Sequence, residues 1–295
     1  MRRILIADRI ATGVLWGVAI FVVAILVAII GHFVIASIPT FSLSFLFSAP
    51  LDEGIGGIGP LLFNSIYMLV LTMLLTIPIG VLGGIYMAEY ASENRFTNAI
   101  RFSQEVISSV PSIVVGLFGM TLFVVGFGWG FTAIGGALTL LVFNLPLLLR
   151  LCEQAIRAVP ADERAASLAL GSTKWQTIRH AVLPVAIPGI VTGIVLTAGR
   201  VFGEAAALLF TAGVATPAHY DYTFISLTDP RSPWSLFHQS TTLSVYIWNI
   251  NSESMNSAAA EISAMSSMVL LAMVLVFNLS SRWLGRTLQR RISGL

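Results

Sequence analysis

Residues 13–38 read GVLWGVAIFVVAILVAIIGHFVIASI, an apolar run without one Asp, Glu, Lys or Arg. A helix needs about 20 mostly apolar residues to cross the hydrocarbon core of a bilayer, so this run is long enough to span a membrane. Met1-Arg2-Arg3 precedes it as in a signal peptide, but the run is about twice as long as the apolar region of a cleavable signal. We therefore expect a retained transmembrane helix.

The whole chain has the composition of a membrane protein. Hydrophobic types make up 56% of its 295 residues and charged types 10%, whereas soluble domains are about 25% charged. Five more runs are long and apolar enough to cross the bilayer, at residues 62–88, 107–127, 131–151, 185–211 and 258–280. The expected fold class is all-α, a polytopic membrane protein with six transmembrane helices and long outer loops at 39–61 and 212–257.

The basic residues indicate how these helices are oriented, because Lys and Arg gather on the cytoplasmic side of membrane proteins. If both termini are cytoplasmic, Arg231 falls outside, Arg200 lies within the fifth helix, and the other fourteen basic residues fall inside. The fourteen are Arg2, Arg3, Arg9, Arg95, Arg101, Arg150, Arg157, Arg164, Lys174, Arg179, Arg282, Arg286, Arg290 and Arg291. We expect a multi-pass protein of the cell membrane with both termini in the cytoplasm.

Several kinds of chemistry find no support in the sequence. It has no GxxxxGK[ST] phosphate loop, no HExxH, no GxSxG and no CxxC, and its four histidines show no ligand spacing. Cys152 is the single cysteine, which excludes an intramolecular disulfide. A net charge of +2 is too small for a nucleic-acid surface. We therefore expect no enzyme activity, no cofactor, no metal site and no nucleic-acid partner.

The predicted cytoplasmic loop 153–184 is polar and interrupted at Gly171. Apolar residues recur at helical spacing on both sides of this glycine, which predicts two short amphipathic helices lying on the inner membrane face. Two interpretations of this pair stay open. It is either a docking element for a cytoplasmic partner or a plain surface helix pair.

Three motifs resemble those of ABC importer permeases, and in particular the A-type permease subunit of phosphate importers. In the loop 153–184, Ala166, Gly171, Leu183 and Pro184 fall on the pattern of the family's EAA loop, although Ala165 stands where that pattern has Glu. Residues 110–119, VPSIVVGLFG, are similar to the VPSIVxGLFG stretch of phosphate permeases. Residues 200–213, RVFGEAAALLFTAG, resemble their RxxGEtaPLLFTAG stretch, with Ala205-Ala206-Ala207 in place of the usual Thr-Ala-Pro.

This resemblance implies a type I permease fold and a subunit that moves inorganic phosphate into the cytoplasm. The implied partners are a homologous C-type permease, two copies of a cytoplasmic ATPase, an external phosphate-binding protein and the lipid bilayer. The alternatives are a permease for another oxyanion, sulfate or molybdate, and an ion-coupled secondary transporter that acts alone. The chain then divides into residues 1–61, a core permease domain 62–213 with its coupling loop 153–184, and residues 214–295. The implied ATPase-coupling residues are Ala166, Gly171, Lys174, Trp175, Leu183 and Pro184.

Four residues are candidates for the substrate path. Arg200 is a charge placed inside the fifth predicted span, and Glu204 at i+4 would share its helix face and neutralise it. A guanidinium matches an oxyanion bidentately, which suits phosphate, although a purely structural ion pair is the alternative. Arg150 is either a basic residue at the cytoplasmic mouth or a side chain reaching the headgroups. Ser112 could offer its hydroxyl to the anion or to a backbone carbonyl freed by Pro111.

Overall fold

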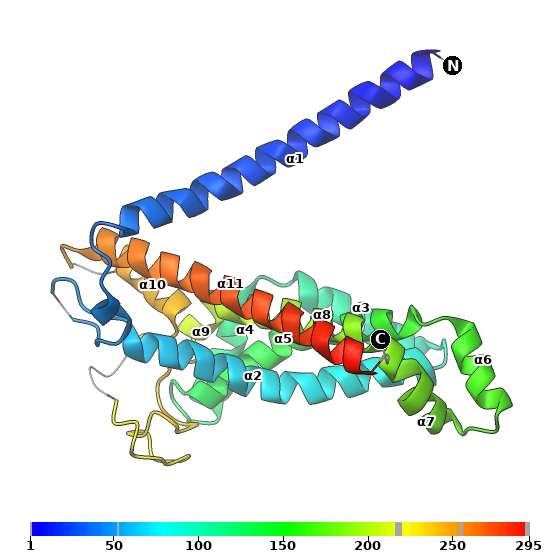
Figure 1. Ribbon diagram of the computed structural model, residues 1–295. Helices are drawn as coiled ribbons and strands as arrows, with labels where there is room; N and C mark the ends of the chain where they lie inside the picture. The colour runs from blue at the N-terminus through cyan, green and yellow to red at the C-terminus, as the bar shows by residue number, and fades with distance from the viewer. Residues whose placement is uncertain (1, 52, 216–219, 254–255, 293–295) are drawn as a thin grey trace.

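The computed structural model describes the chain except residues 1, 52, 216–219, 254–255 and 293–295 (Figure 1). The side chains of residues 2–7, 284 and 286–292 are not described either. Five of the fourteen basic residues that we expect in the cytoplasm therefore lie outside the described side chains: Arg2, Arg3, Arg286, Arg290 and Arg291. The described residues form helices and loops and no strand.

The longer helices are α1 (Arg2–Ser37), α2 (Gly59–Ile85), α3 (Arg95–Ser109), α5 (Ala133–Arg157), α8 (Leu183–Gly203), α10 (Leu243–Ser252) and α11 (Ala259–Ile292). The shorter ones are α4 (Ser112–Gly119), α6 (Ala161–Ala169), α7 (Lys174–Thr177) and α9 (Ala206–Leu209). Four short segments of other helix types are η1 (Leu43–Leu46), η2 (Tyr86–Tyr90), η3 (Met120–Gly126) and η4 (Ile178–Val182).

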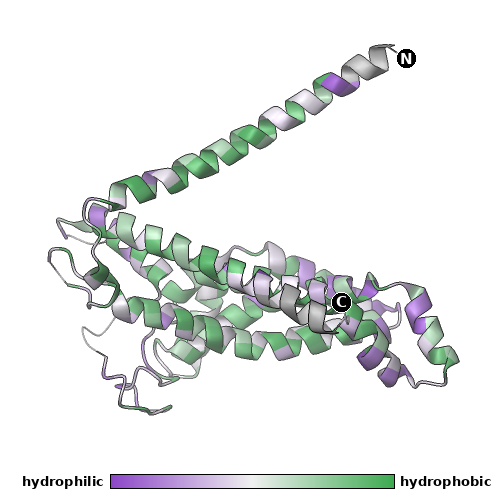
Figure 2. Ribbon diagram, viewed as in Figure 1, coloured by the Kyte–Doolittle hydropathy of each residue, from purple (hydrophilic) through white to green (hydrophobic). Residues whose placement is uncertain are grey.

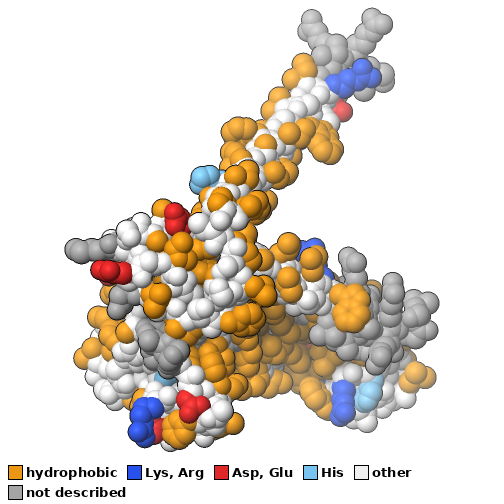
Figure 3. All heavy atoms as spheres, turned by 60° about the vertical axis from the view of Figure 1, so that its left-hand side comes forward, with side chains coloured by type: hydrophobic (Ala, Val, Ile, Leu, Met, Phe, Trp, Pro, Cys, Tyr) orange, Lys and Arg blue, Asp and Glu red, His pale blue; other side chains and the backbone are white. Residues whose placement is uncertain are grey.

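Five helices among the described residues are long and apolar enough to cross a membrane, or six if one bent pair counts as a span. Figure 1 shows most of them running side by side in a bundle, while α1 projects away from it. Hydrophobic residues colour these helices green in Figure 2, and hydrophobic side chains cover α1 along its length in Figure 3. The most apolar 18-residue window of α1 is 0% buried, so every face of that part of the helix is open to lipid or to another protein, while α1 also contacts α11.

The third expected span differs from the prediction, because residues 107–127 are not one helix. The chain turns by 101° between α3 and α4. Pro111 has no backbone N–H and restricts Val110 to an extended conformation with ψ 132°, which ends α3. Only α4 and η3, residues 112–126, continue as an apolar segment, and α3 is an amphipathic helix that lies across its start.

The ends of two other expected spans also differ. The fourth runs on to Arg157, so the first residues of the predicted coupling loop belong to α5. The fifth starts early, since α7, η4 and α8 form one continuous helix from Lys174 to Gly203. It ends at Gly203 instead of Thr211, because Glu204 takes an extended conformation with ψ 118°. Helix α10 lies within the predicted outer loop 212–257 and was not expected.

Helices α2 and α5 pack most closely at two glycines one helical turn apart. A Cβ built on Gly80 would lie 2.7 Å from Cδ2 of Leu148, and one built on Gly84 would lie 2.5 Å from Cβ of Cys152. Small residues at this spacing let two membrane helices approach each other and gain van der Waals contact. The α2–α5 pair is therefore the centre of the bundle. Helix α8 packs against this pair, and α11 packs against α8.

Several polar side chains inside the long helices bond their own helix. Each donates a hydrogen bond of 2.7 to 2.9 Å to the carbonyl four residues earlier. This local bond satisfies the hydroxyl or amide donor within its own helix. Ser65 also accepts from the backbone N–H of Leu243 at the start of α10, and the side-chain oxygen of Asn144 is buried without a partner among the described residues. The donors are Ser65, Thr76, Thr139, Asn144, Thr192, Thr197 and Asn278.

Candidate functional site

The two short helices α6 and α7 form a hairpin at one end of the bundle (Figure 1). Gly171 connects them with φ +81°, a left-handed conformation that favours glycine. Helix α7 begins with a reciprocal cap, in which the Thr173 hydroxyl accepts from the Gln176 N–H and the Gln176 side chain accepts from the Thr173 N–H. The hairpin therefore has a defined turn between two short helices.

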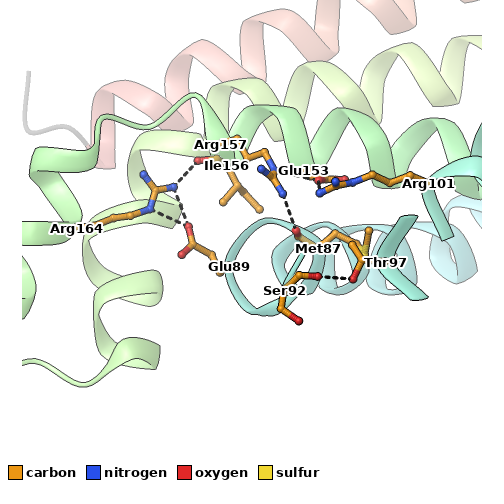
Figure 4. A network of polar contacts seen from close by, with 9 residues as sticks. All are labelled: Met87, Glu89, Ser92, Thr97, Arg101, Glu153, Ile156, Arg157 and Arg164. Atoms are coloured by element: carbon orange, nitrogen blue, oxygen red, sulfur yellow. Dashed lines mark hydrogen bonds and ion pairs between the residues drawn. The ribbon is translucent and has the colours of Figure 1, made fainter. Parts of the chain in front are cut away.

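An arginine holds this hairpin against the end of α2. Both Nε and Nη2 of Arg164 donate to Oε1 of Glu89, at 2.9 and 2.8 Å (Figure 4). The same guanidinium donates to the carbonyls of Ile156 and Val159, which lie at and just beyond the last turn of α5. The Glu89 side chain is 11% exposed, so this is a largely buried, multiply bonded ion pair. It connects α6, η2 and α5 through one side chain.

A second ion-pair cluster lies beside the first. Oε1 of Glu153 accepts from Nη2 of Arg101 on α3 and from Nε of Arg157, both at 3.0 Å (Figure 4). Arg157 also donates to the carbonyl of Met87 at 3.2 Å. The Glu153 side chain is 10% exposed, so one buried carboxylate fixes two guanidinium groups. Through this cluster α3, α5 and η2 are joined at the same end of the molecule.

The predicted coupling residues gather on this hairpin and on the helix that follows it. Ala166, Gly171, Lys174 and Trp175 are exposed, while Leu183 and Pro184 are half-buried at the start of α8. The Lys174 Nζ lies 4.7 Å from the centre of the Tyr90 ring, a second contact with η2. The tip also exposes apolar side chains, with Leu170 88% and Trp175 49% accessible. Exposed apolar residues on a polar hairpin are typical of a protein-docking surface.

Arg200 lies in the last turn of α8, because this helix ends at Gly203 and not at residue 211 as we expected. It precedes the last residue of α8, Gly203, by three positions. Its guanidinium carbon lies 3.8 Å from the centre of the Phe143 ring on α5, a cation–π contact. Within the described part of the chain, Arg200 makes no ion pair and no side-chain hydrogen bond. Its N–H donors are thus left for another group.

The expected Arg200–Glu204 ion pair on one helix face is wrong. The helix ends between the two residues, so the i,i+4 spacing no longer places them on one face. The Glu204 carboxylate instead accepts from the backbone N–H of Ala207 at 3.3 Å, and the Glu204 carbonyl accepts from the Ser244 hydroxyl at 2.8 Å. Glu204 is buried, with 9% of its surface exposed.

The other two substrate-path candidates lie elsewhere. Arg150 is exposed near the end of α5 and lines a groove against α3, next to the Glu153 cluster. Ser112 starts α4, and α4 packs on α9 so closely that a Cβ on Gly116 would lie 2.8 Å from Cα of Ala207. Among the described contacts, none joins Arg150 or Ser112 to Arg200 or Glu204. Arg150 therefore lies apart from Arg200 and Glu204, whereas Ser112 starts a helix that packs on residues 205–209, directly after Glu204.

The opposite end of the bundle is closed by the loop 220–242. Phe63 near the start of α2 meets the rings of Tyr220, Tyr222 and Trp234 at centroid distances of 6.1, 5.2 and 5.0 Å. Burial raises the pKa of Tyr220 to about 12, even though a hydrogen bond with Asn64 opposes that shift. These aromatic residues of the loop thus pack on the start of α2.

His238 is the buried titratable group of this loop. It is 3% exposed, contacts the rings of Tyr67 and Tyr220, and places its Nδ1 2.5 Å from the carbonyl of Ser235. A carbonyl only accepts, so Nδ1 carries the proton and Nε2 is the unprotonated nitrogen. Burial lowers the pKa of His238, since the charged imidazolium loses its hydration.

Sequence reasoning missed the ion pair that anchors the hairpin, Glu89 with Arg164, and the Glu153 cluster beside it. The signal available was their position, because each carboxylate lies where an apolar run gives way to the polar loop. Their partners were not readable from the sequence, since Glu89 and Arg164 are 75 positions apart.

Comparison with known proteins finds similarity over most of the chain. A family model described as "Binding-protein-dependent transport system inner membrane component" matches residues 80–294. The chain is 48% identical over 290 residues to the "Probable ABC transporter permease protein YqgI" of Bacillus subtilis (strain 168), with 98% of each chain covered.

Other relatives are phosphate permeases, matched over about half their length. Identity is 39% over 157 residues to the "Phosphate transport system permease protein PstA" of Xylella fastidiosa (strain 9a5c), covering 53% of this chain and 55% of that protein. For the protein of the same name from Mycobacterium leprae (strain TN), identity is 35% over 170 residues, covering 58% and 56%.

Solved structures share the fold at low sequence identity. A chain of the MetNI methionine ABC transporter, in inward facing conformations, superimposes with a TM-score of 0.57 at 16% identity, covering 76% of this chain and 93% of that one. A chain of a bacterial ABC transporter involved in the import of the polysaccharide alginate gives 0.55 at 14% identity, covering 90% and 95%. The predicted all-helical type I permease fold is confirmed.

Proposed function

The chain belongs to the family of binding-protein-dependent transport system inner membrane components, and from this premise we propose that it translocates inorganic phosphate as a permease subunit of an ABC importer. The importer permease role follows from the family. The observation that carries the choice of phosphate is the match to phosphate permeases over half the chain, together with Arg200. The relative matched over its full length is named only as a permease, so the substrate needs its own test.

The geometry at Arg200 supports an oxyanion as the substrate. Its guanidinium is half-buried, stacks on Phe143 and has no bonded carboxylate among the described residues, so its planar donors can bind an anion bidentately. The Glu204 carboxylate follows the end of the same helix and bonds the Ala207 N–H, so it does not occupy these donors. At neutral pH a phosphate ion carries a hydroxyl group that can donate a hydrogen bond to a carboxylate, whereas sulfate carries none, and this favours phosphate. Arg150 and Ser112 remain candidates for other points on the path.

The α6–α7 hairpin is proposed as the docking site of the ATPase subunits, at a cytoplasmic end of the bundle. One continuous helix leads from Lys174 to Arg200, about 39 Å at 1.5 Å per residue. A displacement of the hairpin would therefore reach Arg200 through one continuous helix. The π-helical turn Ile178–Val182, followed by Pro184 and Pro188, is the place where this helix would bend. The other proposed partners are a C-type permease and an external phosphate-binding protein.

Uptake measurements test the substrate. In cells that carry the complete transporter, Arg200→Met should assemble normally and lose phosphate uptake, because the variant keeps the volume and removes the anion-binding group. Arg200→Lys keeps the charge without the planar fork and should retain only part of the uptake. Arg231→Ala, on the exposed loop, is the matched control and should import phosphate normally. Normal phosphate uptake by Arg200→Met would disprove the role of Arg200.

The same assay separates the alternatives. Uptake of sulfate or molybdate in preference to phosphate would make the chain a permease for another oxyanion. Uptake without any ATPase subunit would make it an ion-coupled carrier.

Coupling is tested at Gly171. Gly171→Pro cannot adopt φ +81°, so the hairpin turn should be lost and transport with it, while the protein still inserts. Cysteines placed at Leu170 or Trp175 should crosslink to the ATPase. Crosslinks that reach only lipid or this chain would leave α6 and α7 as a plain surface pair.

A further inference from the structure

A polar groove lies between α3 and the last two turns of α5, at the end of the bundle that carries α6 and α7. Its volume is about 210 Å³. Since a water molecule occupies about 30 Å³ of liquid, the groove has room for a phosphate-sized anion and several waters. The side chains that line it are all charged or amide groups, in a chain with 10% charged residues. Sites for apolar ligands are lined mostly by hydrophobic residues, so this groove suits a charged ligand.

The sign of that ligand follows from the lining. Three arginines, Arg101, Arg150 and Arg157, face two carboxylates, Glu105 and Glu153. Glu153 is already bonded to Arg101 and Arg157 at 3.0 Å, and its side chain is 10% exposed. Each guanidinium offers five N–H donors. The bonds of Arg101 and Arg157 to Glu153, and the bond of Arg157 to the Met87 carbonyl, use only a few of these donors. The groove is therefore rich in donors and has an excess of positive charge.

The arginines are also held in place before any ligand arrives. Residues 150, 153 and 157 fall on one face of α5, so Arg150 lies about one turn from the Glu153 cluster. Glu153 fixes two guanidinium planes, while Arg150 makes no ion pair or side-chain hydrogen bond among the described residues. Pre-positioned donors lower the ordering cost of binding.

An amide in the groove has an unfilled hydrogen-bonding requirement. The side-chain nitrogen of Gln104 is buried without a partner among the described atoms and lines the groove. A buried donor without a hydrogen bond is unfavourable, and an acceptor in the groove would remove that cost. An anion with several acceptor oxygens could bond Gln104 and the arginines together.

We propose that the α3–α5 groove binds a phosphate group through Arg101, Arg150, Arg157 and Gln104. A phosphate presents several oxygens to planar donors, which is the geometry that arginine matches best. The group has two possible sources, free inorganic phosphate and the headgroup of an anionic lipid. The lipid source is available because α3 lies at 101° to α4 and exposes Phe96 and Phe102, each 68% accessible, as an interfacial helix does. The site does not depend on which oxyanion the importer transports.

Binding assays on the full chain in nanodiscs test the proposal. All variants carry Arg200→Met, so the proposed translocation site does not contribute. The first arm measures binding of radiolabelled inorganic phosphate by equilibrium dialysis in phosphatidylcholine nanodiscs. The second arm measures retention of phosphatidic acid by native mass spectrometry.

Arg150→Gln should weaken binding at least about tenfold in the arm that shows it, since bonds to charged groups are worth about 1.5–3 kcal/mol. Removing the Arg150 guanidinium leaves no described residue without its ion-pair partner, so this variant should fold. Arg150→Lys should lose less affinity than Arg150→Gln, because lysine keeps the positive charge although it lacks the planar pair of N–H donors of a guanidinium. Arg95→Gln removes the same charge from an exposed position of α3 outside the groove and should change binding less than twofold.

The two arms identify the source. Arg150-dependent binding of inorganic phosphate assigns the groove to the free ion, and Arg150-dependent retention of phosphatidic acid assigns it to a lipid headgroup. Absence of binding in both arms, or an equal loss in Arg95→Gln and Arg150→Gln, would overturn the proposal.

Discussion

The two ends of the bundle are held together by different forces. At the end that carries α6 and α7, arginines bond buried carboxylates, and three of the four described ion pairs are found there. At the opposite end, the loop 220–242 is held by aromatic rings around Phe63 and by hydrogen bonds of neutral groups. The fourth ion pair, Asp229 with Arg231, lies on the surface of that loop.

This difference suggests different mechanical roles. Aromatic packing is short-ranged and resists displacement, because separating the rings exposes apolar area at once. Charged groups keep attracting one another as they move apart, and they can exchange partners with a docked protein. The end with the packed aromatic rings is therefore suited to a fixed cap, and the end with the ion pairs is suited to a hairpin that moves when a partner protein pushes on it.

The largest expected effect is at Arg164. Arg164→Ala removes the partner of Glu89, whose side chain is 11% exposed, and should destabilise the hairpin by about 3–5 kcal/mol because a buried charge is stranded. Hydrogen exchange of residues 161–177 measures this directly. The matched control is Arg231→Ala, whose side chain is 84% exposed and whose loss should leave exchange in its own loop unchanged. Equal effects at both arginines would contradict the contrast between the two ends.

A smaller effect is expected at Phe63. Phe63→Ala removes a half-buried ring that contacts three other rings of the loop and should cost about 2–3 kcal/mol of local stability, less than a fully buried Phe would. Exchange should rise in residues 220–242 and not in the α6–α7 hairpin. Phe47→Ala, at a position 79% exposed, serves as the control. If the hairpin loosened as much as the loop, the two ends would not be independent.

The smallest expected effect is a pH dependence confined to the end with the packed aromatic rings. Burial lowers the pKa of His238 below its ordinary value of about 6.5, so the unfolded loop binds a proton more readily than the folded one. The stability of the loop should be constant above pH 6.5 and should fall as the pH decreases through the folded pKa. Hydrogen exchange of residues 220–242, corrected for its intrinsic pH dependence, measures this between pH 7.5 and 5. His238→Gln should show a flat profile, and a retained slope would assign the effect to another group.

The spans were predictable from composition, but the places where they break were not. Four prolines show why. Pro78, Pro146 and Pro188 lie inside α2, α5 and α8, while Pro111 ends α3. Membrane helices tolerate proline when neighbouring groups satisfy the freed carbonyl, and this depends on tertiary contacts. The sequence pattern around Pro111 therefore favoured one continuous span, whereas the structure has two helices that meet at 101°.

The candidate site was predictable to a similar degree. The spacing around Gly171 correctly predicted two helices joined at a glycine. The Arg200–Glu204 pair failed because the i,i+4 argument assumes an unbroken helix, and α8 ends at Gly203. The anchor of the hairpin could not be found, since Glu89 and Arg164 come together only through the fold.

Polar side chains that bond their own helix have a consequence for how the spans slide. A hydrogen bond between two helices must break before one helix can slide along the other. The bonds of Thr139, Asn144 and Thr197 to carbonyls four residues earlier travel with their helices and stay intact. Relative motion then changes van der Waals contacts without breaking these polar bonds, which favours shear between α5 and α8. Because these hydroxyls and amides donate within their own helices, sliding α5 along α8 in either direction breaks none of these hydrogen bonds.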